Sequence, residues 1–163
     1  MSGRYTATRT SLRTGGIMLL FTLAFTALMA STFQVTRPAI EASRQEAQMR
    51  LLAEVLPPGS YDNALLDDYV RFGPAPQIGM DAGGRVWRAR KAGEPVALII
   101  EGAASDGYAG RIGLVVAVHR DGRLSGVRVT EHKETPGLGD YIDPRKDRRK
   151  DAPWIAQFTG ATW

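Results

Sequence analysis

The sequence feature that most constrains this chain is the apolar run from Ile17 to Phe33, IMLLFTLAFTALMASTF. The run contains no charged residue, and only threonine and serine interrupt its hydrophobic side chains. Together with Gly15 and Gly16, and at about 1.5 Å of rise per residue, it reaches nearly across the ~30 Å core of a bilayer. Its backbone groups find hydrogen-bond partners there only in a helix. The sequence therefore predicts a transmembrane helix over residues 15–34.

Two other kinds of apolar segment have a similar composition, the core of a cleaved signal peptide and the buried helix of a soluble domain. A signal cleavage site needs a small-x-small pattern, but neither Ala27 nor Ala30 has a small residue two positions before it. The run is also longer than the ~7 to 15 residues of a signal core. Its length and the basic residues before it argue against a buried helix. The sequence favours an uncleaved anchor.

The charges beside the run predict its orientation. Arg4, Arg9 and Arg13 precede it without an acidic residue among them, whereas Arg37 stands alone on the far side before Glu41. The cytoplasmic flanks of membrane helices carry the excess of basic residues. We therefore expect a cytoplasmic N-terminus in a bacterial inner membrane and a periplasmic main domain. The chain has no cysteine, so disulfides, thiol chemistry and cysteine-ligated metals are not available there.

The chain is basic, with a formal net charge of +4, which raises the possibility of a nucleic-acid partner. Three of the basic residues, however, are topology signals. Five others form a cluster that Asp147 interrupts and that lacks interleaved aromatic residues. Such a cluster is typical of a solvated turn, or of a surface that faces acidic partners or lipid headgroups, so we expect no nucleic-acid partner. The cluster consists of Arg145, Lys146, Arg148, Arg149 and Lys150.

A second helix is expected directly after the span, over residues 35–58. Thr36 and Pro38 have the residue types of a helix start, and Pro57, Pro58 and Gly59 would end the helix. One face is apolar at helical spacing and should dock onto the core of the following domain. That face comprises Ala47, Leu51, Leu52, Val55 and Leu56.

The remaining chain has the pattern of an antiparallel sheet. Residues 61–70 fit a short helix or turn, and the Gly- and Pro-rich residues 73–84 fit an irregular linker. Four strands are expected over residues 86–89, 96–101, 112–119 and 124–131, with turns at Gly93-Glu94-Pro95 and at Asp121-Gly122. The fold class is therefore α+β, an antiparallel sheet with flanking helices. The expected order is a basic tail (1–14), the transmembrane helix (15–34), a juxtamembrane helix (35–58) and one periplasmic domain (59–163).

The clearest candidate for a binding role is the loop after the last expected strand, EHKETPGLGD over residues 131–140. Its proline and glycines would hold exposed backbone amides where a planar or anionic ligand can approach without Cβ clashes. Glu134 and Thr135 would add polar contacts. A purely structural turn fits the spacing equally well, and the loop lacks the patterns of a dinucleotide fingerprint or a P-loop. A second glycine-containing turn, DGYAG over residues 106–110, presents Tyr108.

At these residues the chain resembles a known family. The run VRVTEHKETPGLGD, the preceding GYAGRIGLVVAV and DGRLSGVRV, the LPPGSYDNAL segment and the single N-terminal span are similar to the G subunit of the Rnf (Rsx) membrane electron-transport complex. Its flavin domain is similar to that of the C subunit of the sodium-pumping NADH:quinone reductase. The resemblance extends from the anchor to about Phe158.

The resemblance implies a periplasmic FMN-binding domain that relays electrons in a complex linking ferredoxin oxidation, NAD reduction and ion movement. The protein would position the flavin, which carries the electron. Expected partners are the other membrane and iron-sulfur subunits, the lipid bilayer, and a flavin transferase that joins FMN to a threonine as a phosphodiester. The chain would have no catalytic site for a substrate of its own. The loop near the flavin would comprise Glu134, Thr135, Pro136, Gly137, Leu138 and Gly139.

In the family, the attachment motif has the form Asp-x-x-(Ser/Thr)-Gly-Ala-Thr. Thr159, Gly160, Ala161 and Thr162 match its end, which makes Thr162 the candidate acceptor. The acidic position, however, is Ala156 here. The WIAQF segment also resembles a family segment that lies about two dozen residues upstream of the motif. On that second alignment the acceptor belongs to a C-terminal portion beyond residue 163, and the domain is incomplete.

Other chemistry has little support in the sequence. His119 and His132 have no spaced set of carboxylates that would make a metal site, and no Ser-His-Asp arrangement is present. Asp143 and Asp147 are interpreted as solvated residues, not as an acid/base pair. The alternative function is a cofactor-free, membrane-anchored binding or assembly module, in which the ETPGLGD loop docks a protein.

Overall fold

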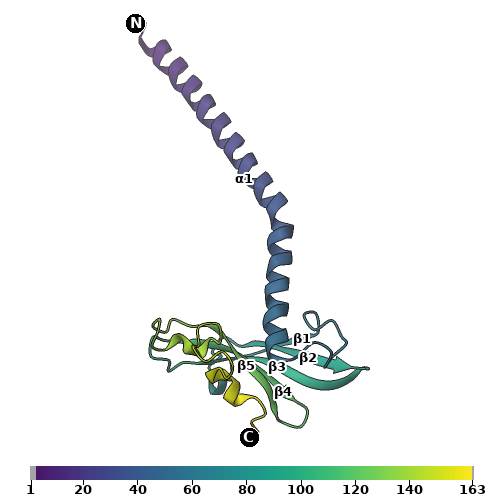
Figure 1. The fold of residues 1–163 in the computed structure, drawn as a ribbon. Coiled ribbons are helices and arrows are strands. Elements are labelled where there is room, and N and C mark those ends of the chain that lie inside the picture. The colour runs from purple at the N-terminus through teal and green to yellow at the C-terminus, as the bar shows by residue number, and fades with distance from the viewer. Residues whose placement is uncertain (1–2, 163) are drawn as a thin grey trace. The chain divides into compact units, whose positions relative to one another are not determined.

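The computed structural model describes residues 3–162 (Figure 1). The chain divides into two compact units, one ending at Glu46 and the other beginning at Ala47. One helix precedes an antiparallel sheet of five strands in the order β1-β2-β3-β4-β5, which confirms the α+β class. The elements are α1 (Gly3–Val55), β1 (Tyr69–Phe72), η1 (Pro76–Ile78), β2 (Gly84–Lys91), β3 (Glu94–Ala104), β4 (Ile112–His119), β5 (Leu124–Glu131), η2 (Asp140–Ile142) and η3 (Trp154–Phe158).

The first unit is the N-terminal part of α1, and it contains the expected apolar run. Among the described residues, α1 is the only helix long and apolar enough to cross a membrane. The large hydrophobic side chains of the apolar run are exposed, as a lipid-facing helix requires. The hydroxyls of Thr22, Ser31 and Thr32 donate to the carbonyl oxygens four residues earlier, at 2.9, 2.7 and 2.9 Å. These three hydroxyls are thus satisfied within the helix, without water.

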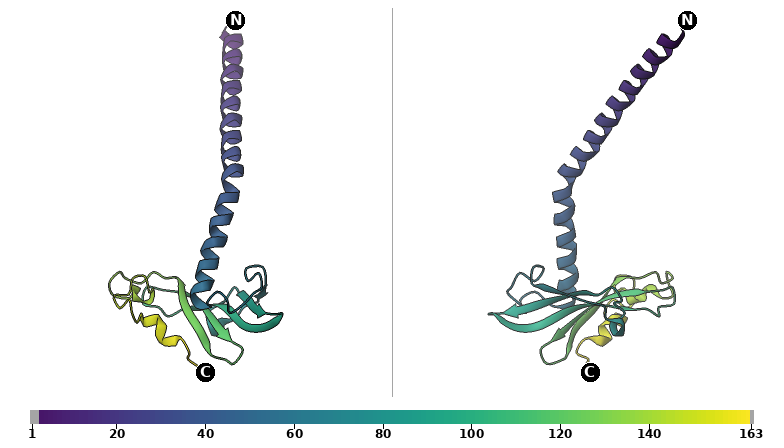
Figure 2. Two further views of the ribbon diagram at one scale, coloured as in Figure 1. Left: turned by 45° about the vertical axis from the view of Figure 1, so that its right-hand side comes forward. Right: turned by 180° about the vertical axis from the view of Figure 1, so that it is seen from behind.

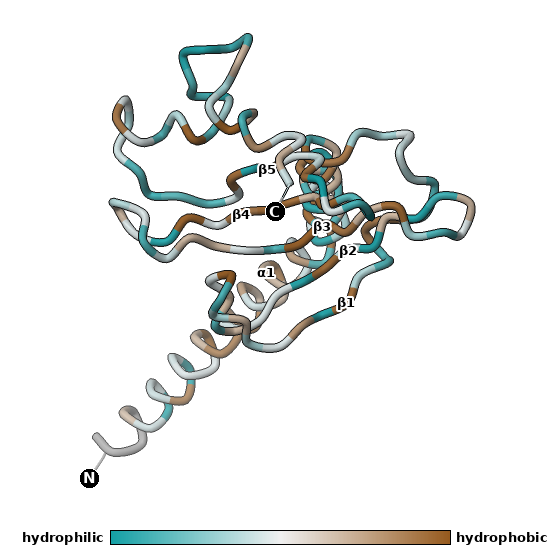
Figure 3. The backbone as a smooth tube through the Cα atoms, turned by 90° about the horizontal axis from the view of Figure 1, so that it is seen from below, coloured by the Kyte–Doolittle hydropathy of each residue, from teal (hydrophilic) through white to brown (hydrophobic). Residues whose placement is uncertain are grey.

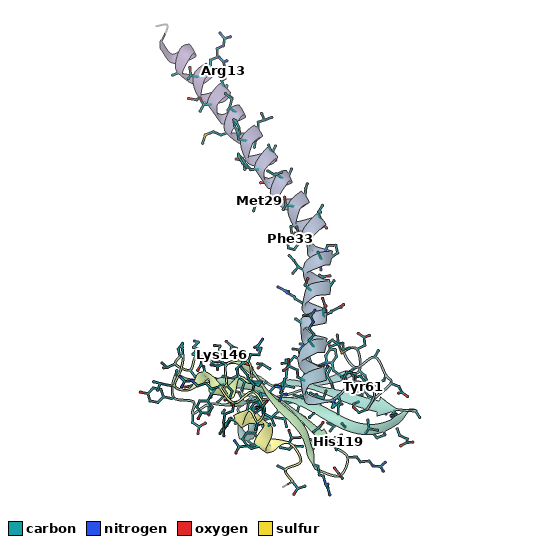
Figure 4. The ribbon with its side chains drawn as sticks, in the orientation of Figure 1. Arg13, Met29, Phe33, Tyr61, His119 and Lys146 are labelled. Atoms are coloured by element: carbon teal, nitrogen blue, oxygen red, sulfur yellow. The ribbon has the colours of Figure 1, made fainter. Side chains whose placement is uncertain are left out.

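The structure has no helix start at Thr36, so that expectation was wrong. Thr36 Oγ1 donates to the carbonyl oxygen of Thr32 at 2.8 Å, as a side chain inside a helix does, and Pro38 also lies inside α1. A proline removes one backbone hydrogen bond and crowds the preceding turn, which bends a helix without necessarily ending it. Figure 4 shows α1 bending near Phe33, about one turn before Pro38.

The sheet of the second unit is an antiparallel meander in which every strand pairs with its neighbour in sequence (Figure 2). The expected strands over residues 112–119 and 124–131 are β4 and β5, with the expected bounds. Gly122 has φ 85°, and His119 N donates to Arg123 O at 2.8 Å across the predicted Asp-Gly hairpin. The first turn lies earlier than expected, at Ala92 and Gly93, and the following proline is already part of β3.

The strand β1 was not predicted, since Tyr69 and Val70 were assigned to a helix or turn and no element was expected at Arg71 and Phe72. β1 is a four-residue edge strand, and long-range contacts with β2 hold it in place. The carboxylate of Asp68, directly before the strand, accepts from Arg88 Nε at 2.7 Å and from Arg90 Nε at 3.1 Å. These ion pairs join residues about twenty positions apart, so local periodicity gives no sign of them.

The core lies between one face of the sheet and the last turns of α1. Leu52, Val55 and Leu56 are at most 1% exposed, which confirms that the apolar face of this helix docks as core. Gly126 of β5 permits the close approach, because a Cβ there would lie 2.9 Å from Val55 O. The buried cluster comprises Leu52, Val55, Leu56, Leu65, Trp87, Ala89, Ala97, Ile99, Val115 and Ala117.

Candidate functional site

The two glycine-containing loops that the sequence singled out meet at one end of the sheet. The DGYAG turn connects β3 to β4, and the ETPGLGD loop follows β5. Ala109 N donates to Glu134 Oε1 at 3.2 Å, which joins the two loops. Tyr108, at the tip of the first loop, is 95% exposed, so it is not a packed core residue. Tyr108 is therefore accessible to a ligand or a partner.

Internal hydrogen bonds hold the ETPGLGD loop in one shape. Leu138 N and Gly139 N both donate to Thr135 O, at 3.1 and 3.0 Å, and Gly137 N donates to Asp140 Oδ1 at 2.8 Å. Gly137 has φ 78°, a backbone conformation that favours glycine. These three amides were expected to face a ligand, but they donate within the loop. The loop instead exposes the side chain of Leu138.

The TGAT segment lies at the start of β5, after η3. Gly160 N donates to Leu124 O at 2.8 Å, and Leu124 N donates to Ala161 O at 2.9 Å, so this pair of hydrogen bonds fixes the segment against the strand. Gly160 has φ 80°. The next residue but one, Thr162, is exposed, and its hydroxyl can be reached from solvent.

The structure does not bring the two groups of candidate residues together. The TGAT segment contacts the first residue of β5, whereas the ETPGLGD loop begins three residues after the last. At about 3.3 Å of rise per residue, the eight residues of β5 put roughly 23 Å between the strand's two ends. Figure 1 shows the C-terminus at a different end of β5 from the lime-coloured loops. The candidate site thus consists of two separate clusters.

An apolar face of the sheet extends between the two clusters. It carries residues that alternate with the core residues of β3 and β4, and therefore lies on the face away from Leu52. Figure 3 shows the hydrophobic character of these strands. One hollow of about 330 Å³ contains Leu124 at the TGAT end, and a second of about 240 Å³ contains Ala104, Ile112 and Val129 at the loop end. The two hollows share Leu114 and Val127, so they are neighbours.

The smaller hollow has an aromatic wall that the sequence analysis did not assign to a site. Trp154 and Phe158 of η3 line it, with their rings 5.3 Å apart in an edge-to-face arrangement. Tyr141 makes a similar contact with Trp154, at 5.7 Å between ring centroids. For Trp154 and Phe158 the sequence signal was the WIAQF segment, which gives no information about the sheet face that they cover.

Asp143 and Asp147 are buried, so their interpretation as solvated residues was wrong. Hydrogen bonds from the Arg145 side chain hold the pKa of Asp143 below its usual value, against the opposing effect of burial. Backbone amides of Trp154 and Arg149 hold the pKa of Asp147 below its usual value in the same way. Both carboxylates shape the chain between η2 and η3.

These lowered pKa values predict how the segment responds to acid. A carboxylate whose pKa falls on folding contributes stability above its unfolded pKa of about 3.9 and loses this contribution as pH drops through the lower, folded value. We expect the NMR signals of the Trp154 and Arg149 amides to stay constant from pH 7 to about pH 4 and to shift only below that. A transition at or above the ordinary aspartate pKa would contradict this account. Asp147→Asn should abolish this transition.

A metal centre finds no support in the part of the chain from residue 3 to residue 162, where no three histidine, aspartate or glutamate residues form a metal-binding group. His132 accepts a hydrogen bond through Nδ1 from the backbone amide of Glu134, at 3.2 Å. This contact gives His132 a structural role at the start of the ETPGLGD loop.

Comparisons with known proteins give matches to the N-terminal helix and to the C-terminal part of the sheet domain. A family model described as the RnfG N-terminal region matches residues 1–55, and one described as an FMN-binding domain matches residues 107–163. Proteins named as the G subunit of an ion-translocating oxidoreductase complex are similar over most of the chain. The relative from Pseudoalteromonas atlantica is 41% identical over 170 residues, covering 92% of this chain and 79% of its own length. The relative from Pseudomonas aeruginosa is 44% identical over 155 residues, covering 94% and 70%. The relative from Salmonella typhimurium is 42% identical over 153 residues, covering 93% and 71%.

Proposed function

Since this chain belongs to the family of G subunits of ion-translocating oxidoreductase complexes, we propose that it is an FMN-carrying electron relay within a multi-subunit membrane complex. The observation that supports this most is the match of residues 107–163 to an FMN-binding domain, because this range contains both candidate clusters and most of the apolar sheet face. The complex would link ferredoxin oxidation, NAD reduction and ion movement. Its iron-sulfur and nicotinamide chemistry would belong to the other subunits.

The residues of the apolar face suit an isoalloxazine ring, which is planar and largely apolar. Binding sites for such groups are concave and mostly hydrophobic, with a few polar groups that fix orientation. For a flavin attached through Thr162, the neighbouring apolar surface is the larger hollow, which Leu124 lines. A flavin held by the ETPGLGD loop would instead lie against Trp154 and Phe158, in the smaller one. We propose the first arrangement, because Thr162 is exposed and the residue before it pairs with Leu124, which lines that hollow.

Bound FMN supplies reversible electron transfer, and the protein supplies position and surroundings. The apolar side chains of the larger hollow would exclude water from one face of the ring. The backbone pairing of the TGAT segment with Leu124 would fix the point of attachment. In the attachment step, Thr162 Oγ1 would form the bond to the FMN phosphorus of an activated nucleotide donor. The hydroxyl would lose its proton, and the rest of the donor would leave; a flavin transferase would catalyse this exchange.

A fluorescence measurement tests the proposal. The full chain is coexpressed with a flavin transferase, denatured and run on a gel under ultraviolet illumination. We expect a fluorescent band that migrates with the polypeptide, and no such band when the transferase is omitted. A folded, membrane-bound chain without flavin under both conditions would favour the alternative, a cofactor-free binding or assembly module.

The proposed location makes a second prediction. We propose that the N-terminus is cytoplasmic and that the domain after α1 lies in the periplasm, because the basic residues precede the apolar run. A reporter that is active only outside the cytoplasm should be active when fused after Leu56. The same reporter fused after Arg13 should be inactive. The reverse pattern would place the flavin domain in the cytoplasm and remove the proposed electron path.

A further inference from the structure

We propose that residues 143–150, which we call the basic loop, form a docking surface for an acidic face of another protein subunit of the same complex. This inference depends on membership of a multi-subunit family and on the structure of the loop, and it does not require that the chain carries a flavin. The loop connects η2 to η3. Four features of the basic loop support the inference: its rigidity, its outward-facing positive charge, its lack of membrane-inserting side chains and its location.

Asp143 holds the first half of the basic loop in shape. Its carboxylate accepts from the backbone amide of Arg145 at 2.9 Å and from the guanidinium of the same residue at 2.9 Å. Its carbonyl oxygen accepts from Lys146 N at 2.9 Å and from Asp147 N at 3.1 Å. The side chain of Asp143 is only 11% exposed. This half is therefore a folded turn and not a flexible basic tail.

Asp147 holds the second half in the same way. Its two carboxylate oxygens accept from Arg149 N at 2.9 Å and from Trp154 N at 2.6 Å, which ties the loop to η3. Lys150 Nζ donates to Arg145 O at 2.7 Å and closes the loop. Asp147 is 4% exposed. Both acidic residues of the loop thus face inward and bind backbone amides, so their negative charge is directed away from the surface.

The cations, in contrast, face outward. The side chain of Arg145 is 82% exposed even though it pairs with Asp143, and Lys146, Arg148 and Arg149 are exposed as well. Within the described residues, neither Arg148 nor Arg149 has an ion pair within 4 Å through its side chain. Guanidinium groups bind carboxylates in a bidentate manner, and their planar fork loses less entropy per hydrogen bond than a lysine ammonium does.

Composition favours a protein over a membrane as the partner of this surface. Surfaces that bind a bilayer combine basic residues with aromatic or aliphatic side chains that enter it. The basic loop, PRKDRRK after Asp143, contains no such side chain. Anionic lipid attraction also acts mainly at the cytoplasmic leaflet, opposite to the proposed location of this domain. Charged, apolar-poor surfaces are typical of transient protein contacts that electrostatics steers.

The basic loop lies at the ETPGLGD end of β5, so a partner bound there would leave the TGAT end of the strand uncovered. Lys146 Nζ lies 4.0 Å from Asp140 Oδ2, so the basic loop adjoins the ETPGLGD loop and the aromatic wall formed by Trp154. Figure 4 shows Lys146 at this end of the sheet and His119 at the other. Weak redox encounters use small interfaces, so a loop of this size is sufficient for such a contact. An acidic subunit bound here would lie beside the smaller apolar hollow.

A zero-length crosslink tests the proposal directly. A water-soluble carbodiimide joins a lysine amine to a carboxylate only when the two are in ion-pair contact. Native membranes that contain the intact complex are treated with it, and the crosslinked peptides are identified by mass spectrometry. We expect Lys146 or Lys150 to be joined to an aspartate or glutamate of another subunit, with a yield that falls severalfold when salt is raised from about 0.05 to about 0.5 M. Crosslinks only within this chain, in an intact complex, would overturn the proposal.

A matched pair of variants separates the basic loop from net charge. Arg148→Glu with Arg149→Glu should lower the crosslink yield about tenfold, because two exposed positive charges of the basic loop become negative and repel an acidic partner. Arg120→Glu with Arg123→Glu makes the same change in charge at the β4–β5 hairpin and should leave the yield unchanged. Equal losses in both variants would overturn the proposal. A third outcome would also overturn it: the unsubstituted chain forms no intersubunit crosslink but binds phosphatidylglycerol vesicles, and the first variant loses this binding. That outcome would identify a lipid-binding surface. The flavin fluorescence of the chain is measured on denaturing gels of the same membranes. Intact crosslinks without flavin fluorescence would count against the proposed function alone.

Discussion

Replacement of Thr162 by alanine is expected to remove all flavin fluorescence that migrates with the denatured polypeptide. A phosphodiester needs the hydroxyl oxygen, and alanine has none. The side chain of Thr162 is exposed, and hydrogen bonds between Leu124 and the preceding two residues fix the backbone just before it. The substitution should therefore leave the fold unchanged while the covalent flavin is lost. The measurement is gel fluorescence after coexpression with a flavin transferase.

Two threonine variants serve as controls for that result. Thr159 is also exposed and belongs to the same TGAT segment, and Thr135 is exposed in the ETPGLGD loop at the other end of β5. Thr159→Ala and Thr135→Ala should each keep the fluorescence. Full fluorescence in Thr162→Ala would show that the bond forms at another residue of the gene product. Loss only in Thr135→Ala would place the flavin at the loop, against the aromatic wall of η3.

Replacement of Trp87 by alanine is expected to cost the sheet domain about 3 to 5 kcal/mol of unfolding free energy. Trp87 is 2% exposed and is the largest side chain of the core, opposite Tyr69 on one neighbouring strand and Ile99 on the other. Its removal leaves a cavity between β2 and the last turns of α1, and it also removes the ring below the guanidinium of Arg85, which lies 4.9 Å from its centroid. Because whole domains have only about 5 to 15 kcal/mol of stability, this loss is a large fraction of the total.

Pulse proteolysis of the full chain in a urea series measures this loss, since it reports the unfolded fraction of the sheet domain and not the helicity of α1. Tyr108→Ala is the matched control, because it removes another aromatic ring that is 95% exposed. Its unfolding free energy should change by less than about 0.5 kcal/mol. Similar losses in the two variants would mean that the core does not lie where the structure places it.

Local patterns in the sequence were sufficient for several elements of this protein. The apolar run, the docking face of the helix around Leu52 and the hairpin at Gly122 were all predicted, because each is encoded within a few neighbouring residues. The continuity of α1 through Pro38 was not predicted, because a proline in the first turn of a helix and a proline at a bend give the same local pattern. The edge strand β1 was missed because its position depends on ion pairs between Asp68 and β2.

The candidate site shows the same division. The sequence by itself determined which segments have the residue types for binding, the ETPGLGD loop and the TGAT segment, since motifs are local. Only the tertiary structure decided that these segments occupy opposite ends of β5, that Asp147 is buried beneath outward-facing cations, and that Trp154 covers an apolar sheet face. Distance and burial arise from pairings between residues far apart in the chain, so no local pattern encodes them.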